Sequence, residues 1–278
     1  NEINNLKNIE SYFGEWVNNV ENLKNKFVNN EPFDNIIIPN FLNLDYINKI
    51  EKVFPTNFNN WYKYDNPLEK KMAYDNINNL EKPLKDVFYL LSSDIMINKL
   101  KILTGMDDLE YDEFLHGAGI HTHPRGGKLA IHLDYEKHPI SGKERRINII
   151  LYVSKNWKEE WNGHTELWNK DISKCVIKSP VIYNSAFIFK TNDISWHGLP
   201  EEIKCPEGVY RKSIAYYYVS SLTSKPNKNK KGSLEDGYRL KASYTLRPQD
   251  QRNENILKLI EIRNRRRITE KDLLNFNK

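Results

Sequence analysis

The sequence predicts a mainly β fold with flanking helices, in which an antiparallel sandwich or jelly-roll core lies between two helical regions. In the first part of the chain, apolar residues recur every three or four positions, as in amphipathic helices. From residue 109 they recur at every second position, in short segments separated by Gly, Pro, Asn and Asp. No long helical pattern lies between these segments, which favours an antiparallel core over a parallel α/β sheet.

We therefore expect one domain over residues 1–278. Its expected parts are a mainly helical N-terminal layer (1–108), a β core (109–222), and a loop with a helical C-terminal appendage (223–278) that packs back on the core.

The helical spacing predicts helices over 3–27 and 44–54, and one long helix or two packed helices over 82–105. A short apolar strand is expected in 34–42, and 56–79 is expected to be irregular. The predicted strands of the core lie in the segments 109–117, 128–135, 146–154, 164–170, 175–179, 185–191 and 212–220. After a polar surface loop at 224–237, helical spacing returns over 249–267.

The composition is that of a folded globular protein, with 39% hydrophobic and 12% aromatic residues. The formal net charge is only +5, and charges of both signs are interleaved, so we expect no nucleic-acid partner. The short basic run "IRNRRR" at 262–267 is more typical of a solvated helix face.

Because the opening residues lack the apolar region of a signal peptide and no apolar run could span a bilayer, we expect a cytoplasmic protein without a membrane partner. Its two cysteines, Cys175 and Cys205, predict buried free thiols.

The segment "AIHLDY" at 130–135 contains the first candidate ligands of a metal. Residues two apart on a strand face the same side, so His132 and Asp134 point together. A buried carboxylate without a partner is costly, and a divalent metal is an efficient partner for it. His197 in "SWHGLP" lies late enough for sheet closure to bring it near. Two histidines and one carboxylate form the facial triad associated with non-haem Fe(II) oxygenases.

A second group of polar residues follows at the start of a strand. Alternation places Arg211, Ser213, Ala215 and Tyr217 on one face of "YRKSIAYYY". A planar guanidinium binds a carboxylate through two parallel hydrogen bonds, so Arg211 with a nearby hydroxyl is a suitable carboxylate receptor.

Four motifs in this order resemble the 2-oxoglutarate- and Fe(II)-dependent dioxygenases, and among them the prolyl-4-hydroxylase-like branch. They are "HPRGGKLAIHLDY", "RRINIILYVSKNWKEEWNGHTELW", "PVIYNSAFIFKTNDISWHGLP" and "RKSIAYYYVS", and the resemblance covers about residues 109–222. It implies a double-stranded β-helix (jelly-roll) core.

The resemblance also implies a set of cofactors and site residues. Fe(II) is expected on His132, Asp134 and His197, with O₂ and 2-oxoglutarate as cosubstrates. Arg211 is expected to bind the distal carboxylate of 2-oxoglutarate, assisted by Tyr152 and Ser213, and Asn148 shares a face with Tyr152. The reaction expected is hydroxylation of an unactivated C–H bond, with release of succinate and CO₂. Asp134 favours hydroxylation over halogenation, because halogenases of this superfamily leave that position free for halide.

One departure from the family pattern concerns the residues before the first iron ligand. Many relatives have an aromatic hydroxyl about ten residues before it, where this chain has Thr122 between His121 and His123. Those histidines are either donors in the pocket or polar loop residues.

Two rival interpretations remain at this point: a cupin-like metal site that uses the H-x-H of His121 and His123, and a non-catalytic jelly-roll module that binds carbohydrate. The cupin interpretation lacks the usual glutamate and leaves Asp134 and Arg211 without a role. The substrate is open among a small molecule, a sugar, an amino acid and a prolyl peptide, and the sequence does not indicate the oligomeric state.

Overall fold

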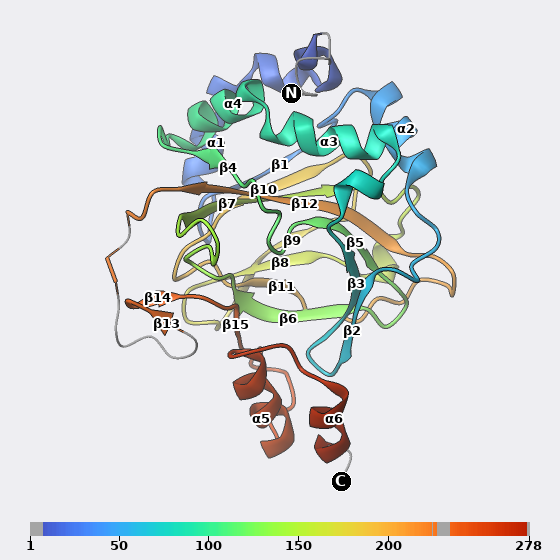
Figure 1. The fold of residues 1–278 in the computed structure, drawn as a ribbon, viewed down its shortest axis with the longest axis vertical. Coiled ribbons are helices and arrows are strands. Elements are labelled where there is room, and N and C mark those ends of the chain that lie inside the picture. The colour runs from blue at the N-terminus through green and yellow to red at the C-terminus, as the bar shows by residue number, and fades with distance from the viewer. Residues whose placement is uncertain (1–7, 224, 227–233, 277–278) are drawn as a thin grey trace.

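A nearly closed barrel of mostly antiparallel strands forms the centre of the computed structural model, and a layer of helices covers one side of it (Figure 1). The structure describes residues 8–223, 225–226 and 234–276. Its α-helices are α1 (Val20–Asn29), α2 (Leu44–Val53), α3 (Lys82–Ser92), α4 (Asp94–Thr104), α5 (Glu254–Arg263) and α6 (Glu270–Phe276). This architecture confirms the predicted jelly-roll core with flanking helices.

Thirteen of the strands form one large sheet that wraps around a cavity. Neighbouring strands follow the order β1-β10-β7-β12-β5-β3-β6-β11-β8-β9. Their bounds are β1 (Asn35–Ile38), β3 (Glu69–Tyr74), β5 (Gly119–His123), β6 (Lys128–Leu133), β7 (Glu144–Tyr152), β8 (Thr165–Trp168), β9 (Cys175–Ser179), β10 (Ala186–Lys190), β11 (His197–Leu199) and β12 (Arg211–Ser220). Off this path, β2 (Tyr62–Asn66) pairs with β3, β4 (Glu110–Tyr111) with β12, and β15 (Ser243–Tyr244) with β6.

The alternation along β7 and β12 separates the core from the cavity. On β7, Ile149 and Leu151 belong to the buried apolar cluster shared with the helices, whereas Asn148 and Ile150 line the cavity. The helices contribute apolar side chains such as Phe27, Ile47, Leu91 and Leu100 to the same cluster. Burial of these side chains, at about 25 cal/mol per Å² of apolar surface, holds the helical layer on the outer face of the barrel.

The predicted helix over 3–27 is wrong in its extent. Within the described part, 3₁₀ turns at Ile9–Tyr12 and Glu15–Asn18 precede α1. The break lies at Gly14, whose backbone N–H donates to the carbonyl of Phe41 at 2.9 Å. A Cβ on Gly14 would lie 1.8 Å from the carbonyl oxygen of Asn40, so this close backbone approach replaces helical hydrogen bonds.

Residues 82–105 form two helices, which was one of the two alternatives. They meet at Ser93, which has extended backbone angles and caps α4 by accepting a hydrogen bond from the N–H of Met96.

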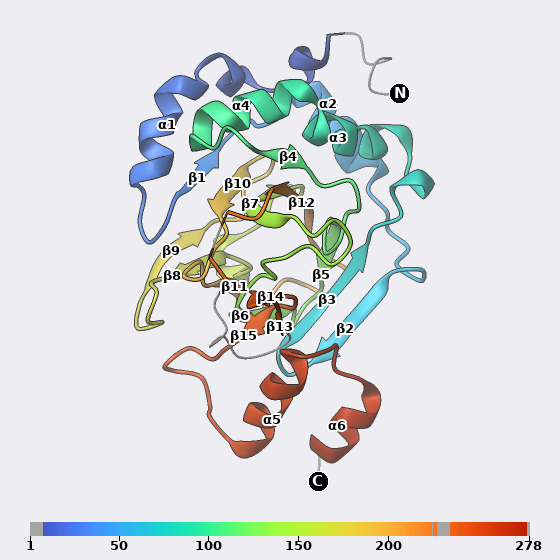
Figure 2. The same cartoon turned by 60° about the vertical axis from the view of Figure 1, so that its left-hand side comes forward.

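The expectation of irregular structure over 56–79 is also wrong, because β2 and β3 form a hairpin along one side of the barrel (Figure 2). Asn66 stabilises its turn by accepting hydrogen bonds from the N–H groups of Leu68 and Glu69. Strand β3 pairs with both β5 and β6 and thereby joins the two halves of the barrel. The "EKKMAY" of β3 lacks an apolar alternation because several of its side chains face the cavity.

The C-terminal helices extend beyond the barrel more than expected (Figure 1). In α5 only Leu259 is buried, and Arg263 at the end of this helix forms an ion pair with Glu69 at 2.7 Å. The predicted surface loop at 224–237 lies largely outside the described residues, and its last part, β13 (Leu234–Glu235), pairs with β14 (Tyr238–Arg239). Both cysteines are free, with Cys205 buried and Cys175 partly buried. None of the helices in the described ranges is long and apolar enough to cross a membrane.

Candidate active site

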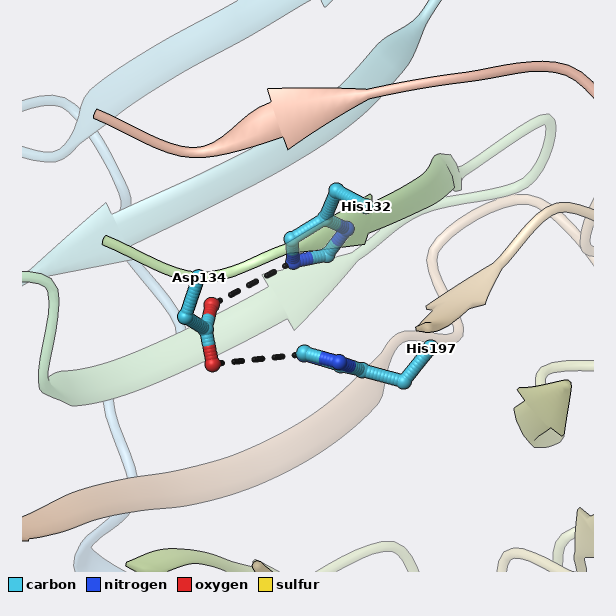
Figure 3. A group of neighbouring side chains, drawn as sticks. All are labelled: His132, Asp134 and His197. Carbon is cyan, nitrogen blue, oxygen red and sulfur yellow. Dashed lines mark ion pairs between the residues drawn. The ribbon is translucent and has the colours of Figure 1, made fainter. Parts of the chain in front are cut away.

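The barrel brings His132, Asp134 and His197 together in one cluster, as the spacing predicts (Figure 3). Adjacent strands β6 and β11 place His132 and His197 directly opposite each other, and Asp134 follows the end of β6. The Nε2 atoms of His132 and His197 lie 3.5 and 3.4 Å from the two carboxylate oxygens of Asp134. One ligand atom from each residue lies within 4.8 Å of the others, so a single metal ion can bind all three.

Hydrogen bonds behind the two histidines fix their orientation. The Nδ1 atom of His132 lies 2.8 Å from the carbonyl of Ala130, and Nδ1 of His197 lies 2.7 Å from that of Ser195. A carbonyl oxygen only accepts hydrogen bonds, so each Nδ1 carries the proton and each Nε2 offers a lone pair toward Asp134. This is the usual support for a metal-binding imidazole, and the donor set therefore fits Fe(II).

A glycine permits the close approach of the two ligand strands. A Cβ on Gly198, next to His197, would lie 2.8 Å from the carbonyl oxygen of Leu129 and 2.9 Å from that of Ala130. Any larger residue would push β11 away from β6 and separate the two histidines.

The surroundings of Asp134 keep its carboxylate ionised. Burial alone raises the pKa of Asp134, but the Arg145 guanidinium, His197 and His132 have a larger opposite effect, so the pKa lies well below its usual value. Burial lowers the pKa of His197 to about 4 despite the attraction of Asp134. At neutral pH the cluster thus contains an anionic carboxylate and a neutral His197, the protonation states that metal binding requires.

Arg211 lies in the wall of the same cavity, at the start of β12, as expected. Its side chain is buried, its Nε donates to the carbonyl of Gly163 at 2.7 Å, and its Nη2 donates to the hydroxyl of Thr165 at 3.1 Å. No carboxylate among the described residues forms an ion pair with it. A buried guanidinium held in this way is ready to bind an anion.

The other three predicted residues lie at different places in and behind the cavity wall. Ser213 and Asn148 line the cavity, and the Asn148 amide donates to Asp134 at 3.2 Å. Tyr152 lies behind the cavity wall, with its ring 5.1 Å from the Arg211 guanidinium carbon and its hydroxyl within hydrogen-bond distance of Thr165 and Ser179. In this arrangement Tyr152 orients Thr165 and Arg211.

The histidines of "HTH" belong to strand β5 and not to a loop. His121 and His123 both line the cavity, whereas Thr122 between them points to the opposite face. Burial, followed by the cations Lys71 and Arg211, lowers the pKa of His121 to about 3. The pKa of His123 is also lowered by burial and by the same two cations, and neither of its ring nitrogens has a hydrogen-bond partner within the described part of the chain.

Sequence reasoning missed several residues of this cavity, which has a volume of about 780 Å³. They are Tyr64 and Lys71 from the hairpin, Tyr135 from the loop after β6, and Arg145 from the start of β7. Alternation alone would not have found Arg145, because it lies three positions before Asn148 and would face the other side of a regular strand. A register shift between Arg145 and Ile147 brings it to the cavity side. Lys71 could not be predicted as a cavity residue, because the pattern of its segment did not indicate a strand.

A two-histidine, one-carboxylate cluster inside an antiparallel barrel is the arrangement associated with non-haem Fe(II) oxygenases. Residues 118–219 match the family model described as the 2OG-Fe(II) oxygenase superfamily. The barrel region is thus similar to the 2OG-Fe(II) oxygenase superfamily, whose members use Fe(II), 2-oxoglutarate and O₂.

Solved structures of the same fold include prolyl hydroxylases. One is a prolyl hydroxylase in complex with a hypoxia inducible factor oxygen degradation domain peptide fragment, from Trichoplax adhaerens, at 16% identity and a TM-score of 0.52; the match covers 76% of this chain and 96% of that one. Another is a prolyl-4-hydroxylase from Pseudomonas putida, at 12% identity and a TM-score of 0.53, covering 72% of this chain and 98% of that one. No curated protein sequence matched the chain.

Proposed function

We propose that this enzyme hydroxylates an unactivated C–H bond of a small molecule, a sugar, or an amino-acid or prolyl substrate, with release of succinate and CO₂. The observation that supports this is the presence, in one cavity, of the His132, Asp134 and His197 cluster and of the Arg211 guanidinium. When bound, Fe(II) with O₂ supplies the oxidising chemistry, while the protein orients the reactants and excludes water.

In this proposal the cluster holds the iron through Nε2 of both histidines and the carboxylate of Asp134. Three ligands leave the other coordination positions for cosubstrate and O₂. A carboxylate at position 134 also occupies the place that a halogenase of this superfamily leaves for halide, which favours hydroxylation as the outcome. The Asn148 amide, 3.2 Å from Asp134, keeps that carboxylate in position.

Arg211 binds the distal carboxylate of 2-oxoglutarate. The hydrogen bonds from Arg211 to Gly163 and Thr165 hold its guanidinium in place before the cosubstrate arrives, and Tyr152 holds Thr165. Ser213, which lines the cavity two residues along the same strand, is placed to donate a further hydrogen bond. Because the site is buried, each charge-assisted contact is stronger than it would be in water.

The arrangement gives less support to the rival functions. Within the described ranges, the group with metal-ligand geometry is His132, Asp134 and His197, and it does not include His121 or His123, on which a cupin-like site depends. A module that only binds carbohydrate does not require a buried arginine such as Arg211, which has no carboxylate partner among the described residues.

Formation of succinate from 2-oxoglutarate is the test of this function. Purified protein is supplied under air with Fe(II), ascorbate and 2-oxoglutarate, and succinate is quantified by proton NMR. We expect slow succinate formation without added substrate, abolished by omission of iron and by Asp134→Ala. The proposal fails if the wild-type protein binds neither 2-oxoglutarate nor a divalent metal.

A further inference from the structure

The cavity contains more positive charge than the proposed iron and 2-oxoglutarate sites require. Arg211 is assigned to the distal carboxylate of the cosubstrate, and Asp134 to the metal. Further cations line the same cavity, among them Lys71 and Arg145. Apart from Asp134, the lining contains one carboxylate, Asp75, and it is exposed to solvent.

Arg145 is the more deeply buried of the two cations, with 3% of its surface exposed. Its guanidinium carbon lies 3.1 Å from the ring centroid of Tyr217 and 4.0 Å from that of Tyr135. One nitrogen, Nη1, lies 3.3 Å from the carboxylate of Asp134. Its Nε and Nη2 have no hydrogen-bond partner in the described part of the protein. A buried donor without a partner is costly, so a missing acceptor is expected here.

Lys71 reaches the cavity from strand β3. Its ammonium lies 5.0 Å from the ring centroid of Tyr64, and among the described residues no carboxylate lies within ion-pair distance of it. The nearby Glu69 is already paired with Arg263 at 2.7 Å. Burial lowers the pKa of Lys71, while Glu69 and Asp134 act in the opposite direction.

The basic run near the C-terminus adds further charge at the rim of the cavity. Arg263 and Arg266 are neutralised by Glu69 and Asp272. Arg267, by contrast, stacks on the ring of Tyr62 at 4.1 Å and has no ion pair within the described ranges. The segment "IRNRRR", expected to be a solvated helix face, therefore lies partly at the entrance of the cavity, where positive charge attracts anions.

We propose that the substrate carries an anionic oxygen group, a carboxylate or a phosphate, which binds between Lys71 and Arg145 while 2-oxoglutarate occupies Arg211. This inference rests on the proposed function and narrows its substrate class to an anion. A divalent metal bound to Asp134 would neutralise part of the charge of this carboxylate. The Arg145 guanidinium would then be attracted less strongly to Asp134 and could pair with a substrate anion. The tyrosine rings beside both cations can pack against the rest of the molecule, and the cavity of about 780 Å³ suits a small metabolite beside the cosubstrate.

The test uses acetate and methylphosphonate as probes of the two anion types. Protein loaded with Zn(II) and saturated with 2-oxoglutarate cannot turn over, and the probes' methyl protons report weak binding by saturation-transfer NMR. We expect at least one probe to bind, and Lys71→Gln and Arg145→Gln each to weaken its binding about tenfold. The stronger probe identifies the anion as carboxylate or phosphate.

Matched controls lie on the opposite faces of the same strands. Arg146 hydrogen-bonds to Ser220, and neither Arg146 nor Lys70 lines the cavity. Arg146→Gln and Lys70→Gln change the net charge equally and should alter probe binding less than twofold. Lys71 is only partly buried, so Lys71→Gln tests the proposal even if Arg145→Gln does not fold.

Two failures are distinguishable in the same spectra. If the protons of 2-oxoglutarate show no binding to the Zn(II)-loaded wild-type protein, the proposed function is wrong. If 2-oxoglutarate binds but neither probe does, or if the cavity variants and their controls behave alike, the anionic substrate is wrong and the oxygenase assignment stands.

Discussion

Arg211 and Lys212 are consecutive on β12, yet their cationic groups lie on opposite sides of the sheet. Arg211 lines the cavity and donates to Gly163 and Thr165. The Lys212 ammonium lies 3.5 Å from the carboxylate of Glu51 and 5.4 Å from the ring centroid of Phe54, on the side of the helical layer. The pair therefore provides two substitutions of similar chemistry, only one of which reaches the proposed cosubstrate.

Arg211→Lys should strongly raise the concentration of 2-oxoglutarate that the enzyme requires. A lysine has a compact ammonium group in place of the planar guanidinium, so it cannot form both hydrogen bonds of the arginine. Loss of one charge-assisted pair costs about 1.5–3 kcal/mol, which corresponds to roughly ten- to hundredfold weaker binding. The measurement is the KM for 2-oxoglutarate in a succinate assay. Lys212→Ala should change this KM less than twofold, and equal effects of the two substitutions would contradict the assigned role of Arg211.

Asp134→Ala should abolish turnover while the protein remains folded. The substitution removes the anionic ligand, and two histidines alone bind Fe(II) too weakly to retain it. We expect metal affinity to fall by about a hundredfold or more, measured by calorimetry with Mn(II), with an unchanged circular dichroism spectrum. Wild-type levels of succinate production by a folded Asp134→Ala protein would refute the metal assignment.

Gly163→Ala should weaken 2-oxoglutarate binding by displacing Arg211. Gly163 has a φ of +86°, and an added Cβ would lie 3.2 Å from Cδ of Arg211 and 3.3 Å from the ring of Trp157. Gly208 provides a matched control, since its φ is +81° but no atom lies within 4 Å of an added Cβ. Both alanine variants should lose about 1–2 kcal/mol of stability from backbone strain. Only Gly163→Ala should raise the KM for 2-oxoglutarate, by about tenfold, and similar KM values for both variants would show that Arg211 tolerates the displacement.

Much of the fold and of the metal cluster follows from local alternation. The i, i+2 spacing of His132, on β6, and Asp134, just after its end, predicts that both side chains point the same way. The strand-like segments after residue 109 account for most of the barrel. Contacts between distant segments were harder to anticipate. Strand β3 owes its conformation to pairing with β5 and β6, and its polar residues pack into the cavity where apolar ones would ordinarily mark a strand.

The substrate side of the cavity escaped sequence reasoning for the same reason. Lys71 and Arg145 lie 74 positions apart in the chain and meet the cavity only because the sheet closes. Either residue alone looks like an ordinary surface cation. Their importance depends on burial, on the absence of an ion pair for Lys71 and on the lack of acceptors for Nε and Nη2 of Arg145 among the described residues. These properties appear only in three dimensions.

The histidines of β5 should make the metal-free protein less stable as the pH falls. Burial, Lys71 and Arg211 lower the pKa of His121 to about 3 in the folded state, whereas an unfolded histidine titrates near 6.5. Above about pH 6.5 neither state binds this proton, so His121 leaves stability unchanged there. Between about pH 6.5 and 3 only the unfolded state binds it, and stability falls by at most about 1.4 kcal/mol per pH unit.

His121→Asn should remove the proton that the unfolded state binds at this position, and so reduce the dependence of stability on pH. The free energy of unfolding by urea, measured with a chelator present from pH 7 to pH 4.5, should depend on pH less steeply in the variant than in the wild type. A loss of stability that is the same at every pH does not affect the slope of unfolding free energy against pH. The metal-ligand histidines are present in both proteins, so their contribution to the two slopes cancels. His123→Asn should behave in the same way, because burial and the same two cations also lower the pKa of His123. Parallel pH curves for the wild type and both variants would mean that these histidines accept protons in the folded state, and that the cavity is less cationic than its lining implies.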